Sequence, residues 1–107
     1  SNLPHELVYA FSATLEETID ANALVLVVDA SDPHKYEQIE VVETELKRLD
    51  IDLNKVILVY NKIDKLNENE MQNLKKYNYD TCFIGAKTGK NIEILKEKIR
   101  EKLESFS

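Results

Sequence analysis

Three side chains that could read a nucleotide base stand close together near the middle of the chain: the amide of Asn61, the ammonium of Lys62 and the carboxylate of Asp64. An ionised carboxylate can accept from two adjacent N–H donors, and guanine offers such a pair at N1 and N2, whereas adenine does not. Asn61 can bond the other edge of the base or tie neighbouring loops together, while the aliphatic stem of Lys62 can lie against the ring. We therefore expect residues 61–64 to bind guanine.

A second short segment, Gly85, Ala86 and Lys87, follows another apolar stretch and supplies complementary groups. The backbone N–H of Ala86 could donate to guanine O6, where adenine carries an amino group. Gly85 favours a tight loop, and the stem of Lys87 could cover the ring face opposite Lys62. The alternative is that both segments are only turns, because Asn and Asp often form turns after a strand. Their places after successive apolar stretches favour base recognition.

Asp29 and Asp32 follow a third apolar stretch and could hold a divalent cation or accept a phosphoryl group. Asp32 stands before Pro33, as expected for a residue that caps a helix, so only Asp29 lacks an explanation of this kind. The two histidines have no cysteine or carboxylate partners at metal-ligand spacing. We therefore expect structural roles for both aspartates, and neither a catalytic residue nor a metal site.

Helix-like and strand-like segments alternate along the chain, and this order must position the three polar segments. Strands are predicted at 23–28, 55–61 and 81–84, and helices at 5–20, 33–49, 68–77 and 91–103. The alternation predicts an α/β fold of three layers, α-β-α, with a parallel sheet of three strands between helices. Ligands of such sheets bind outside the carboxyl ends of the strands, so we expect all three polar segments at one edge.

Composition excludes several classes of protein. The 107 residues suit one domain. With 14 Lys and Arg against 20 Asp and Glu, the chain is acidic, which argues against a domain that binds nucleic acid mainly through the phosphates of the nucleic acid. A local contact with RNA stays open. The chain has 2 Gly, where about 7% of residues are glycine in an ordinary protein, which excludes a glycine-rich phosphate-binding loop. A single cysteine and the lack of a long apolar run favour a cytoplasmic location without membrane contact.

The segments 61–64 and 85–87 resemble, in order and context, the two guanine-specificity motifs of translation-factor-class GTPases. Residues 3–17 narrow the resemblance, because they are similar to the helix after the second switch in the HflX family of ribosome-associated GTPases. Residues 27–32 and 59–64 also resemble that family. The resemblance implies the C-terminal half of a P-loop GTPase fold, GTP or GDP as ligand, Mg2+ bound elsewhere in the longer protein, and the large ribosomal subunit as partner.

Departures from the family pattern limit what the chain itself can do. The phosphate-binding loop, the switch regions and the metal-binding Asp-x-x-Gly motif are absent, so we expect residues 1–107 to form a partial GTPase domain that does not hydrolyse GTP unaided. The family usually has Ser where this chain has Gly85. The apolar strand at 23–28 would have a bare edge, from which we expect a homodimer.

Two functions of other classes stay open. One is a receiver-like signalling domain, in which Asp29 or Asp32 accepts a phosphoryl group and Lys87 is the partner cation. The other is a non-catalytic α/β interaction module, whose polar edge residues only form turns.

Overall fold

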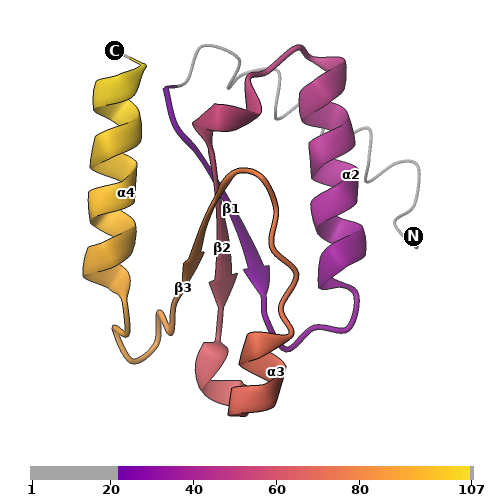
Figure 1. Ribbon diagram of the computed structural model, residues 1–107, viewed down its shortest axis with the longest axis vertical. Coiled ribbons are helices and arrows are strands. Elements are labelled where there is room, and N and C mark those ends of the chain that lie inside the picture. Colours follow the sequence, from indigo (N-terminus) through magenta and orange to yellow (C-terminus); the bar gives the residue numbers. More distant parts are fainter. Residues whose placement is uncertain (1–21, 107) are drawn as a thin grey trace.

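The computed structural model describes residues 22–106, so the predicted helix at 5–20 and the family-like stretch 3–17 lie outside the described part. Three strands form one parallel sheet, and the main helices flank it (Figure 1). The strands are β1 (Leu24–Asp29), β2 (Val56–Asn61) and β3 (Asp80–Phe83), and the helices are α2 (Lys35–Arg48), α3 (Glu68–Gln72) and α4 (Ile92–Ser105). Single 3-10 turns at Leu53–Lys55 and Ile63–Lys65 bracket β2. The predicted α/β fold is confirmed.

The central strand β2 is buried on both faces, as its run of apolar residues predicts. Alternate side chains enter two separate cores. Leu58 and Tyr60 pack on the side of α2, with Ile39 of that helix, whereas Ile57 and Val59 pack on the side of α4. The sheet is therefore the middle of three layers.

The edge strand β1 is only partly covered. It pairs with β2 from Leu24 to Asp29, and β2 pairs in turn with β3. Helix α4 packs over residues of β2 and β3, and Val25 and Val27, which point to the same side, remain 41% and 53% exposed. The prediction of a strand at 23–28 is confirmed, but its outer face is less buried than its composition suggests.

The connection between α3 and β3 is fastened to the core by two tyrosines. The Tyr60 hydroxyl donates to the carbonyl of Lys75 at 2.6 Å, and the N–H of Lys75 donates to the Tyr36 hydroxyl at 3.1 Å. Helix α3 has the predicted capping box of Asn67 and Glu70, yet it ends at Gln72, short of the expected residue 77. Because tyrosine hydroxyls take both backbone groups of Lys75, this residue cannot continue the helix.

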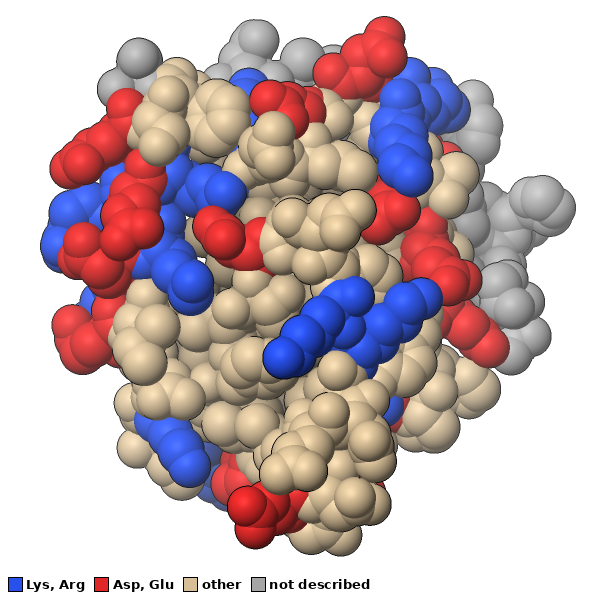
Figure 2. Space-filling view, in the orientation of Figure 1, with Lys and Arg blue, Asp and Glu red and all other residues tan. Residues whose placement is uncertain are grey.

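The surface seen in Figure 2 mixes charges of both signs. Along α4, Lys96 pairs with Glu93 and Arg100 with Glu97, each three residues away. Lys and Arg side chains on this face are therefore interspersed with Asp and Glu rather than gathered into one basic patch. Within residues 22–106, no helix is long and apolar enough to cross a membrane.

We predict that Tyr60→Phe lowers the free energy of unfolding by about 1 kcal/mol, because the buried Tyr60 side chain loses its part-buried hydrogen bond to the Lys75 carbonyl. Urea unfolding followed by circular dichroism measures this change. Tyr77→Phe is the matched control, because the Tyr77 hydroxyl is buried without a partner in the described part of the chain, so its removal should cost no stability. Equal losses for the two variants would contradict the proposed fastening.

Candidate functional site

The three polar segments lie together at the carboxyl edge of the sheet, at the bottom of Figure 1. Asp29 is the register partner of Asn61 on the neighbouring strand. The loops after β2 and β3 meet where the N–H of Ile63 donates to the carbonyl of Ile84 at 3.2 Å. This edge is the place where ligands of parallel sheets bind.

Asn61 links the loop after β2 to the loop after β3. Its Oδ1 atom accepts the N–H of Lys62 at 2.8 Å and the N–H of Ala86 at 3.0 Å. Of the two roles expected for Asn61, tying neighbouring loops is the one observed. The Ala86 N–H, which we expected to meet guanine O6, is engaged with Asn61 in this structure.

Lys62 adopts the left-handed backbone conformation, with φ 63°. A residue with a side chain is strained there, at a cost on the order of 1–3 kcal/mol, so the surroundings must hold it. The bonds of the Lys62 and Ile63 N–H groups do so, and the side chain crosses to β1, where Nζ lies 3.3 Å from Asp29 Oδ2. The lysine therefore spans two loops.

Asp29, for which the sequence predicted only a structural role, lies beside Lys62 at this edge. Its Oδ1 atom accepts the Ser31 hydroxyl at 2.6 Å and the Ser31 N–H at 2.9 Å. These hydrogen bonds lower the pKa of Asp29 to about 2, and the nearby Lys62 ammonium acts in the same direction. Partial desolvation of the carboxylate raises the pKa but is outweighed. The Asp-x-Ser spacing, which is typical of a side-chain turn after a strand, was the available signal.

Asp64 presents a carboxylate with no hydrogen bond or ion pair to the rest of the described chain. It lies on the turn Ile63–Lys65 and is exposed, and its Oδ1 atom would be 3.6 Å from a Cβ atom at Gly85. Both of its oxygens are therefore open to a ligand with two adjacent N–H donors.

The loop after β3 closes on itself around Gly85. Its carbonyl accepts the Thr88 hydroxyl at 3.1 Å, and Gly85 also exchanges backbone hydrogen bonds with Lys90. Gly89, with φ 78°, has the left-handed conformation that favours glycine. Position 85 favours glycine for a different, steric reason: a Cβ atom there would lie 2.9 Å from Thr88 Oγ1. Lys87 follows in the same loop and is exposed, and within residues 22–106 it has no hydrogen bond or ion pair.

Asp32 serves the start of α2. Its carboxylate accepts the N–H of His34 at 2.8 Å and the Gln38 side chain at 3.3 Å. Because the side chain engages His34, the regular helix begins at Lys35, two residues beyond the expected Pro33. In the part of the chain that the structure describes, no group of three or more His, Cys, Asp or Glu could hold a metal ion.

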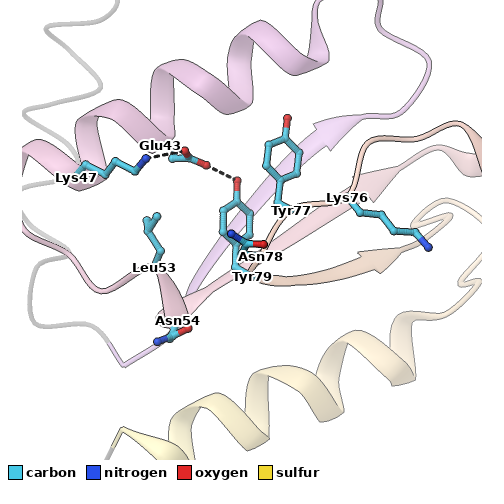
Figure 3. A pocket seen from close by; sticks show the side chains of 8 residues that line it. All are labelled: Glu43, Lys47, Leu53, Asn54, Lys76, Tyr77, Asn78 and Tyr79. Carbon is cyan, nitrogen blue, oxygen red and sulfur yellow. Dashed lines mark hydrogen bonds and ion pairs between the residues drawn. The ribbon is translucent and has the colours of Figure 1, made fainter.

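Neither of two cavities in the described part of the chain is lined by the six predicted residues. A cavity of about 300 Å³ opens near the amino ends of the strands, where the Tyr79 hydroxyl donates to Glu43, and Lys47 pairs with the same carboxylate (Figure 3). A second, of about 280 Å³, lies between α2 and α3 and touches Ser31.

We predict that Gly85→Ser destabilises the chain by about 1 kcal/mol, because its Cβ atom would push Thr88 out of its bond to the Gly85 carbonyl. Thermal unfolding measures the loss. Thr88→Ala removes both the bond and the obstacle, so adding Gly85→Ser to Thr88→Ala should cost nothing more. A further loss in the double variant would show that another contact excludes a side chain at position 85.

The sequence was compared with known proteins. No family model matches it. The GTPase HflX of Magnetococcus marinus is 40% identical over 98 residues, which cover 92% of this chain and 23% of that protein. The GTPase HflX of Escherichia coli is 38% identical, over 95% of this chain and 24% of that protein. The GTPase HflX of Methanocaldococcus jannaschii is 34% identical, over 95% of this chain and 27% of that protein. The chain thus spans about a quarter of the length of these relatives.

Solved structures agree with this relationship. A GTP-binding protein from the archaeon Sulfolobus solfataricus, in complex with GDP, matches with a TM-score of 0.70 and 27% identity, over 97% of this chain and 37% of that one. A second GDP complex, of SsGBP, matches with a TM-score of 0.66 and 26% identity, over 97% and 36%. These matches confirm that the sheet and its helices are part of a P-loop GTPase fold. With the sequence identities, they show that the chain belongs to the HflX family, as a segment of the longer proteins found there.

Proposed function

We propose that this chain is the guanine-recognising part of a longer GTPase, and that residues 61–64 and 85–87 bind the base of GTP or GDP. The observation that carries the proposal is the carboxylate of Asp64, which has no hydrogen bond or ion pair within residues 22–106 and is exposed at the carboxyl edge of the sheet beside the Gly85 loop. The GDP complexes of the structural relatives add support.

Each proposed contact follows from the chemistry of the groups at this edge. Asp64 accepts the N1 and N2 hydrogens of guanine, and the stems of Lys62 and Lys87 lie against the ring. Asn61 keeps the two loops together, and the Ala86 N–H, which it now holds at 3.0 Å, turns to guanine O6 or is shared with it. Residues 1–107 would thus be a partial GTPase domain that contributes base recognition.

We assign phosphate binding, Mg2+ and hydrolysis to the remainder of the longer protein. Phosphoryl transfer depends on a phosphate-binding loop with its lysine and on Mg2+, which neutralises the developing charge. The groups described at this edge can instead recognise the base through one carboxylate, one amide and the stems of two lysines. Such a small set of contacts must offset the entropy of association, so we expect this chain alone to bind GDP weakly.

For the longer protein we propose the large ribosomal subunit as partner and the cytoplasm as location. The support is membership of the HflX family, which the sequence identities show. Base recognition in this chain does not depend on that partner.

We predict that Asp64→Asn reverses the preference of the site between GDP and xanthosine diphosphate. Xanthine replaces the N2 amino group with an oxygen, so an Asn amide, which offers both a donor and an acceptor, suits it better than a carboxylate does. Titrations of the 15N-labelled chain with millimolar nucleotide, followed by NMR, should show a change of about tenfold or more in the ratio of the two affinities.

Asp52→Asn is the matched control, because Asp52 caps the turn before β2 by accepting the Asn54 N–H at 2.9 Å, at the opposite end of the strand. It should leave both affinities unchanged. An unchanged preference in Asp64→Asn would instead favour the non-catalytic interaction module.

We also propose that two copies of this chain associate through β1. In the described residues β1 pairs only with β2, and the exposed Val25 and Val27 lie beside its open edge. An edge of this kind is a template for pairing with another strand.

Light scattering at high protein concentration should accordingly show a dimer, and Val27→Lys should return it to a monomer, because a charge on the edge opposes pairing. Ile94→Lys, at a similarly exposed position on α4, should leave the dimer intact. A strict monomer at all concentrations would contradict the association.

A further inference from the structure

Asp29 engages two loops with its two oxygens. Oδ1 accepts both the hydroxyl and the N–H of Ser31, within its own loop. Oδ2 lies 3.3 Å from the ammonium of Lys62, in the loop after the neighbouring strand. The carboxylate is therefore oriented by Ser31 before it meets the lysine.

The lysine is constrained at its other end as well. The left-handed backbone of Lys62 directs its side chain, and the N–H of this residue is bonded to Asn61 Oδ1. A four-carbon stem that is held at both ends has few conformations left, whereas an exposed lysine normally samples many. The pair thus fixes the course of the stem across the carboxyl edge of the sheet.

The value of this ion pair lies in position more than in stability. The side chains of Lys62 and Asp29 are 49% and 31% exposed, and ion pairs as exposed as this contribute little to stability. Since the pKa of Asp29 is about 2, however, its charge is present at every pH near neutrality. The Lys62 ammonium therefore lies beside a charged carboxylate throughout that pH range.

We propose that Asp29 and Ser31 are positioning residues of the guanine site, which hold the stem of Lys62 as a preformed wall for the face of the base. This inference rests on the proposed function of residues 61–64. Because Asp29 already orders the Lys62 side chain, binding of the base does not have to offset the loss of conformational entropy of that lysine.

The test is a double-variant cycle on the 107-residue chain, with GDP affinity measured by NMR titration. Asp29→Asn and Lys62→Ala should each weaken binding by about threefold to tenfold, as expected for neighbours that act together. The double variant should be no weaker than Lys62→Ala alone. Asp32→Asn is the control in the same loop, because Asp32 bonds His34 and Gln38 and should not affect the affinity.

A second readout needs no nucleotide. In the free chain, the Asp29 carboxyl signal should titrate near pH 2, and the side-chain signals of Lys62 should move with the same midpoint. Ser31→Ala should raise that midpoint, because Asp29 Oδ1 loses the Ser31 hydroxyl, its strongest hydrogen-bond donor, and keeps only the Ser31 N–H. A Lys62 signal indifferent to Asp29 would overturn the inference.

The outcomes separate this inference from the function on which it rests. GDP binding that is lost in Asp64→Asn but unchanged in Asp29→Asn overturns the positioning role and leaves guanine recognition standing. If the unsubstituted chain does not bind GDP even at millimolar concentration, the proposed function and this inference are both overturned. Additive losses from Asp29→Asn and Lys62→Ala would show that Asp29 acts other than through the lysine.

Discussion

Burial of one strand on both faces is the constraint on which this structure depends. Every side chain of β2 from Val56 to Tyr60 is buried, which requires a covering layer on each side of the sheet and a neighbouring strand at each edge. The strand then changes from the buried Tyr60 to the polar Asn61 in a single step. Because β2 is central, Asn61 lies between the ends of β1 and β3. Its amide oxygen there accepts hydrogen bonds from Lys62 in its own loop and from Ala86 in the loop after β3.

The same position explains how the loops at the carboxyl edge are connected. A continuous series of contacts runs from Ser31 through Asp29, Lys62 and Asn61 to Ala86, so the loops after all three strands are connected. Asp64 stands outside this series. Within residues 22–106 the edge therefore has a connected framework and one carboxylate without a partner, which is the division that the proposed base recognition requires.

Much of this fold could be predicted from the sequence, because burial leaves a clear pattern. The runs around Leu26 and Leu58 indicated buried strands, and Asn67 with Glu70 indicated a capped helix that the structure confirms. The early end of α3 could not be predicted, since it depends on tyrosine hydroxyls that reach Lys75 from distant parts of the chain. Hydrophobic periodicity records which face is buried but not which hydroxyl meets which backbone group.

The location of the candidate residues could be predicted from the sequence, but their detailed geometry could not. The residue types and their order after the strands indicated Asn61, Lys62 and Asp64, and the structure brings them to one edge. The partnership of Lys62 with Asp29 depends on a left-handed backbone that a lysine rarely adopts, and no spacing rule predicts it. Likewise, the reason for glycine at position 85 is the hydroxyl of Thr88, which only the closed loop brings near.

The parallel order of the strands also has a kinetic consequence. Leu24 pairs with Val56, and Ile57 pairs with Asp80, so each pairing brings together residues with a helix between them in the sequence. The entropy of closing such a loop is lost before any ladder hydrogen bond forms. Since β1 and β3 both pair with β2 and not with each other, neither gains a partner until that strand is in place. Docking of β2, rather than formation of the helices, is therefore expected to set the rate at which this chain folds.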